Sequence, residues 1–126
     1  SRAYHITPEG IFQISRDHSV VENMVAKGDL TPLEARTHPN RNLITRALGP
    51  DIHAKADTFE LPWHKDEFLL LCSDGLVNTV SDQEMLFEVL HDGDVNECLD
   101  HLLQISLQRG APDNITAVLL LNEEGR

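Results

Sequence analysis

The alternation of apolar and polar residues predicts where the strands of this chain lie. Tyr4 and Ile6 alternate with polar residues, a turn is expected at residues 7–10, and Ile11, Phe12 and Ile14 follow, so the chain opens on a β-hairpin. Two nearly continuous apolar runs, at residues 68–72 and 115–121, predict strands with both faces covered. A further strand is predicted at residues 56–61, and extended structure is favoured at residues 41–48.

Four helices are predicted from their start and stop signals. Capping-box or capping residues open them at Ser19, Thr31, Ser81 and Asp94. Gly28, Pro39 and Gly110 stand where the first, second and fourth helices should end. Helices without strict alternation with the strands give an α+β architecture.

Two aspartates lie next to the ends of predicted buried strands. Asp74 follows the strand at residues 68–72, and Asp113 precedes the strand at residues 115–121. If the two strands are antiparallel neighbours, both carboxylates lie at one rim of the sheet. Converging carboxylates repel unless a cation lies between them, and oxygen ligands favour hard ions such as Mg²⁺ or Mn²⁺. The alternative is turn chemistry, in which Asp74 caps a turn and Asp113 forms an Asx turn.

Composition narrows the classes of function. The 126 residues suit one small domain, and the formal net charge of −11 argues against a nucleic-acid-binding face. No apolar run in this chain is long enough to cross a bilayer. Cys72 and Cys98 form no C-x-x-C pair, so two free buried thiols in a reducing, cytoplasmic compartment are expected.

Six short motifs, in order along the whole chain, resemble the bacterial type 2C metal-dependent serine/threonine protein phosphatases. Two of them carry the aspartates: Leu-Leu-Cys-Ser-Asp-Gly-Leu at residues 70–76 and Gly-Ala-Pro-Asp-Asn-Ile-Thr at residues 110–116. The others are Ser-Arg-Ala-Tyr at residues 1–4 and three segments of the family's flap at residues 16–19, 30–39 and 42–49. These motifs resemble those in the C-terminal half of that family's phosphatase domain.

The resemblance implies a fold, a reaction and a set of ligands. The fold would be half of a β-sandwich with flanking helices, from the four-layer αββα phosphatase fold, with residues 1–126 inside one phosphatase domain and a helical flap at residues 17–48. The reaction would be hydrolysis of phosphoserine and phosphothreonine in proteins by water activated between two metal ions, Mn²⁺ or Mg²⁺. On this pattern Asp74 and Asp113 are metal ligands.

His38 has two interpretations. It lies in the flap, where it would contribute beside the substrate path, or it merely precedes Pro39 at a helix end. The resemblance also implies phosphoprotein substrates of a serine/threonine kinase.

The family's N-terminal motifs, a Glu-Asp pair, an arginine for phosphate and a bridging aspartate, do not occur in this sequence. We therefore expect a chain cut inside the domain, with exposed sheet edges that favour pairing with another copy. The rival hypothesis is a non-catalytic module that binds a partner or oligomerises. The 126-residue chain alone is expected to be inactive in either case.

Overall fold

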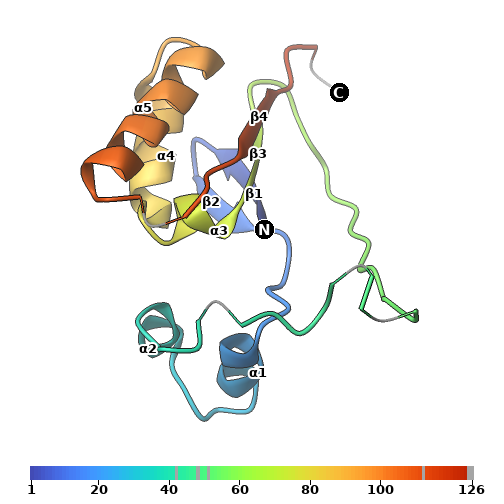
Figure 1. Ribbon diagram of the computed structural model, residues 1–126. Coiled ribbons are helices and arrows are strands. Elements are labelled where there is room, and N and C mark those ends of the chain that lie inside the picture. Colours follow the sequence, from blue (N-terminus) through green and yellow to red (C-terminus); the bar gives the residue numbers. More distant parts are fainter. Residues whose placement is uncertain (42, 48, 51, 112, 125–126) are drawn as a thin grey trace. The chain divides into compact units, whose positions relative to one another are not determined.

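The computed structural model describes residues 1–41, 43–47, 49–50, 52–111 and 113–124. The chain divides into two compact units (Figure 1). The first contains residues Ser1–Ser15 and Glu60–Arg126, and the second contains Arg16–Phe59. The sheet and both predicted aspartates belong to the first unit, and His38 belongs to the second.

A four-stranded antiparallel sheet forms the centre of the first unit. Its strands are β1 (Arg2–Thr7), β2 (Gly10–Gln13), β3 (Phe68–Cys72) and β4 (Ala117–Leu121), in the order β2-β1-β3-β4. The hairpin β1–β2 and the strand at residues 68–72 confirm the sequence predictions. β3 pairs with β4 from Phe68↔Leu121 to Cys72↔Ala117, so these two strands are antiparallel neighbours.

Three helices cover one face of this sheet: α3 (Asp74–Val77), α4 (Asp82–His91) and α5 (Val95–Gln108). Tyr4, Ile6 and Leu70 point toward them and are fully buried. Met85 of α4 and Leu102 of α5 are buried in the same core, because the apolar residues of each helix recur every three to four positions. The Tyr4 hydroxyl donates to Asp82 at 3.1 Å and so joins β1 to the start of α4.

Within the first unit the described residues leave the opposite face of the sheet partly exposed, which corrects the prediction that both faces of the two apolar strands are buried. Leu71, Val118 and Leu120 are 44%, 46% and 41% exposed, and Leu71 pairs with Val118. The residues between them in each strand, Leu70 and Leu119, are buried. An uninterrupted apolar run predicts burial of both faces, but the described residues of the first unit supply helices to only one of them.

The second unit is small and mostly exposed. Its helices are α1 (Val20–Ala26), capped by Ser19, and α2 (Pro32–Arg36), opened by a full capping box at Thr31. Among its described residues only Ser19 and Val21 are buried. An ion-pair cluster within this unit joins Asp57 to His18 and Arg46, at 2.7 and 2.9 Å.

Several predicted boundaries differ from the structure. Residues 56–61 form no strand, because their backbone pairs with no described strand. Between residues 41 and 48 the described part contributes one isolated bridge, Ser19↔Ile44, and residues 42 and 48 lie outside the described residues. β4 begins at Ala117, two residues after the predicted start. Within the described chain no helix combines the length and apolarity that a membrane span requires.

Candidate functional site

The rim of the sheet where β3 ends and β4 begins carries both predicted metal ligands. Cys72 is the last residue of β3 and pairs with Ala117, the first residue of β4. Asp74 follows β3 and opens α3, whereas Asp113 lies in the loop that leads into β4. The shared rim requires that β3 and β4 are antiparallel neighbours, and they are. The two segments that carry Asp74 and Asp113 therefore meet at one rim.

Hydrogen bonds join the backbones of the two segments at this rim. The amide of Ser73 donates to the carbonyl of Thr116 at 2.9 Å, and the amide of Thr116 donates back to the Ser73 hydroxyl at 3.0 Å. That hydroxyl also lies 3.5 Å from the carbonyl oxygen of Asn114. The residues next to Asp74 and Asp113 are thus held close to one another.

Gly75 permits this close approach. A Cβ at this buried position would lie 2.2 Å from the carbonyl oxygen and 3.0 Å from the carbonyl carbon of Asn114. Both are backbone atoms, so no side-chain rotation could relieve the contact. Glycine is the residue that permits so close an approach of two backbones.

The two carboxylates differ in their local partners. The carboxylate of Asp113 is exposed and accepts from the amide of Asn114 at 2.7 Å. Asp74 is half-buried, and its carboxylate accepts no hydrogen bond from any residue that the structure describes. Ser73, and not Asp74, is the N-cap of α3. The capping alternative for Asp74 is therefore not what the described residues show, and its oxygens suit a hard divalent cation.

His38 lies just after α2, in the unit formed by residues 16–59. Its Nδ1 accepts from the amide of Asn40 at 3.1 Å, and its carbonyl oxygen accepts from the amide and the guanidinium of Arg41. These bonds close a local turn around Pro39. They agree with the interpretation of His38 as a helix-end residue, and its role beside a substrate stays a prediction.

A second cluster of metal-ligating side chains joins α4 to α5. His101 Nδ1 lies 3.0 Å from Asp92 Oδ1 and 3.6 Å from Glu88 Oε2, and one ligand atom from each of the three residues lies within 4.8 Å of the others. The hydrogen bond to Asp92 raises the pKa of His101, while burial, with Asp92 nearby, raises the pKa of Glu88. The cluster works as an ion-pair network between two helices.

Sequence reasoning missed this network because only Glu88 and Asp92 have helical spacing. His101 comes from a helix whose packing the pattern alone does not set. Asp92 lines a small cavity with Phe68 and Leu121, the residues that pair at the opposite end of β3 and β4 from Cys72 and Ala117. The cluster is therefore separate from the Asp74 rim.

No family profile matches the chain, but the curated proteins that are similar to it are serine/threonine phosphatases. The serine/threonine phosphatase stp of Listeria monocytogenes is 34% identical over 129 residues, covering 100% of this chain and 51% of that protein. The serine/threonine protein phosphatase PstP of Mycobacterium tuberculosis is 38% identical over 120 residues, covering 94% of this chain and 23% of that protein. The chain thus spans about half the length of the first of these relatives and less of the second.

Solved structures show the same likeness. The serine/threonine phosphatase Stp1 from Staphylococcus aureus superposes with a TM-score of 0.90 at 40% identity, over 98% of this chain and 48% of that one. A PstP catalytic domain described in complex with 2 manganese ions superposes with a TM-score of 0.77 at 35% identity, over 94% and 48% of the two chains. The α+β fold with its antiparallel sheet is therefore the fold of the matching half of these structures.

Proposed function

Because this chain is homologous over its whole length to bacterial serine/threonine phosphatases, we propose that it is the C-terminal part of a metal-dependent protein phosphatase domain. The proposed reaction is hydrolysis of phosphoserine and phosphothreonine in protein substrates of a serine/threonine kinase. The observation that carries the proposal is the shared rim, where Ser73 and Thr116 join the segments that hold Asp74 and Asp113.

Asp74 and Asp113 would each contribute carboxylate oxygens to divalent cations, Mn²⁺ or Mg²⁺. Such ions supply Lewis-acid activation and a water nucleophile at neutral pH. The contribution of this chain is geometric, since backbone hydrogen bonds and the Gly75 contact hold both aspartates on rigid segments. His38 is kept as a candidate contributor from the flap at residues 17–48.

The uncovered sheet face supports the assignment to part of a sandwich. Leu71, Val118 and Leu120 present apolar surface that water does not favour, as the inner face of a β-sandwich would. In a complete domain we propose that a second sheet covers this face. The competing module hypothesis would place another protein, or a second copy of this chain, on the same surface.

The test uses the full-length protein, a phosphothreonine peptide and Mn²⁺. Turnover should fall by at least about 100-fold in Asp74→Asn and in Asp113→Asn, because positioning of the ions is lost. Asp100→Asn, an exposed aspartate on α5, is the matched control and should keep full activity. The 126-residue chain alone should be inactive, since two carboxylates hold Mg²⁺ or Mn²⁺ only weakly. Full activity in both rim variants would contradict the proposal.

A further inference from the structure

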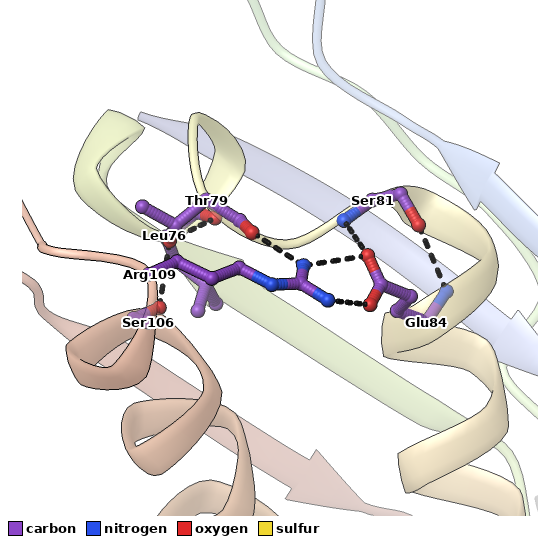
Figure 2. Close-up of polar contacts among 6 residues, drawn as sticks. All are labelled: Leu76, Thr79, Ser81, Glu84, Ser106 and Arg109. Carbon is purple, nitrogen blue, oxygen red and sulfur yellow. Dashed lines mark hydrogen bonds and ion pairs between the residues drawn. The ribbon is translucent and has the colours of Figure 1, made fainter.

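Arg109 is the C-cap residue of α5, and its side chain joins this helix to α4 and to the turn that follows α3. Its Nη1 donates to the carbonyl oxygen of Thr79 at 2.7 Å and to Glu84 Oε1 at 2.9 Å. Its Nη2 donates to the second oxygen of Glu84 (Figure 2). The pair is therefore bidentate, and it fixes the end of α5 in both distance and orientation.

Glu84 is held at the same time from the other side. Its Oε1 accepts from the amide of Ser81 at 3.0 Å, and its own amide donates to the Ser81 hydroxyl at 3.2 Å. This capping box opens α4, so the carboxylate that receives Arg109 cannot rotate freely. Figure 2 shows the guanidinium lying between Thr79 and Glu84.

Thr79 continues the connection toward the rim. Its hydroxyl donates to the carbonyl oxygen of Gly75 at 2.9 Å and lies 2.7 Å from the hydroxyl of Ser106, which is fully buried in α5. Gly75, next to Asp74 in sequence, packs directly on the backbone of Asn114. The contacts thus run from Arg109 through Thr79 and Gly75 to Asn114.

The chain itself closes this path. After Arg109, Gly110 adopts a φ of 90°, and the amide of Ala111 donates to the carbonyl oxygen of Ser106 at 3.0 Å, which turns the chain toward Asp113 and Asn114. Contacts and covalent bonds therefore form a closed ring that includes Arg109, Thr79, Gly75 and Asn114, with Asp74 and Asp113 adjacent to it. Asp113 follows Arg109 by four positions, so the position of the end of α5 restricts where Asp113 can lie relative to Asp74.

We propose that the Arg109–Glu84 pair is a positioning clamp that sets the spacing of Asp74 and Asp113 and thereby tunes metal affinity. This inference rests on the proposed function, because it requires that the two aspartates bind metal. Arg109 touches neither ion nor substrate in this scheme. It acts through the segment that carries Asp113, as partners outside a metal's ligand set orient its ligands.

The experiment measures Mn²⁺ affinity by calorimetry in the full-length protein, together with the melting temperature. Arg109→Gln should weaken Mn²⁺ binding by about 10-fold, the low end of the loss found when groups that orient metal ligands are removed. Glu84→Gln should also weaken binding, by no more than Arg109→Gln, since Arg109 keeps its bond to Thr79. The double variant should be no weaker than Arg109→Gln alone, because Glu84 has already lost its bonds to Arg109 in that variant. Arg109→Lys should bind Mn²⁺ more tightly than Arg109→Gln but less tightly than the wild type. Lysine keeps the positive charge but lacks the planar guanidinium that donates two parallel hydrogen bonds.

Asp94→Ala is the matched stability control. It removes the N-cap at the other end of α5, where the Asp94 carboxylate accepts from the amides of Asn96 and Glu97. It should lower the melting temperature but leave the Mn²⁺ affinity within about twofold of wild type. If Arg109→Gln also changes only the melting temperature, the clamp is overturned. If Asp74→Asn binds Mn²⁺ as tightly as the wild type does, the proposed function itself fails, and the clamp with it.

Discussion

Glu84 is the residue whose ionisation responds most clearly to its neighbours among the exposed acids. The Arg109 guanidinium and the Ser81 amide lower the pKa of its carboxyl from 4.5 to about 2. Both partners donate to the ionised form, so they stabilise the folded protein wherever Glu84 is charged. Removal of Arg109 takes away the larger of these two effects.

The stabilising effect of Arg109 should therefore depend on pH. A carboxyl whose pKa is lower in the folded state stabilises the fold above its unfolded value of 4.5, and that stabilisation is lost as pH falls toward 2. The difference in melting temperature between wild type and Arg109→Gln should be constant above about pH 5.5 and shrink steadily below about pH 4.5. Thermal unfolding followed by circular dichroism across this range is the measurement. A difference that grows as the pH falls would contradict the assignment.

At the scale of elements, the junction between α3 and the Asp113 loop leaves no room for a side chain at Gly75. Alanine normally stabilises a helical position by about 0.5–1 kcal/mol relative to glycine. Here the added methyl would meet the Asn114 backbone, and such overpacking costs roughly 1–3 kcal/mol or more. The clash should outweigh the gain in helix propensity, because the Asn114 atoms that the methyl group would meet belong to the main chain.

Gly75→Ala should accordingly lower the free energy of unfolding by about 1–3 kcal/mol, measured by urea denaturation. Gly93→Ala is the matched control, because the nearest atom to its added Cβ would be Glu97 Oε2 at 3.7 Å, an ordinary contact. That variant should stay within about 0.5 kcal/mol of wild type or gain slightly. Equal effects at the two glycines would show that the Asn114 contact is not what constrains Gly75.

The elements that sequence reasoning found are those whose signals are local. Capping residues at Thr31 and Ser81 and the apolar run at residues 68–72 act over a few positions, and each element formed where predicted. The rim was foreseen in the same way, because Asp74 and Asp113 stand at strand ends. The distance between their carboxylates and their role as ligands stay predictions.

The features that sequence reasoning missed depend on contacts between distant residues. In residues 56–61 the strand formers Thr58 and Phe59 stand among poor ones and have no described strand to pair with, so the segment remains irregular. The four-residue helix α3 forms against the Asn114 loop, which no local signal reveals. The helix start predicted at Ser81 uses Glu84 in its capping box, but the carboxylate of Glu84 also accepts from Arg109, 25 positions further along the chain, and no local signal indicates that.

For the whole molecule, the important feature is a sheet with one covered and one uncovered face. Leu71, Val118 and Leu120 lie together on the uncovered face, where β3 and β4 pair. Fully burying an exposed apolar side chain contributes about 1.5–3 kcal/mol. These three side chains are 41–46% exposed, so we expect each to contribute part of that energy when another surface covers this face. The 126-residue chain alone should expose it.

We expect the isolated chain to bind the dye ANS and to self-associate in light scattering. Replacing Leu71, Val118 and Leu120 together by threonine should lower both signals, because threonine keeps strand propensity but reduces apolar area. Leu33→Thr on α2, at a side chain of the second unit that is 78% exposed, is the control and should change neither signal. Unchanged ANS binding in the triple variant would show that the dye binds a surface other than this sheet face.

The strand order β2-β1-β3-β4 also sets how the protein can fold. Ile6 pairs with Phe68 and Arg2 with Cys72, so these partners are 62 and 70 positions apart, and Phe68 and Leu121 are 53 apart. Only the β1–β2 hairpin joins strands that are close in sequence. Closing long loops costs entropy before any contact repays it, whereas α4 and α5 need only the short connection at residues 92–94. The helical pair and the hairpin can therefore form early, and the central strand β3 gains its two neighbours late, at the step that also brings the Asp74 and Asp113 segments together.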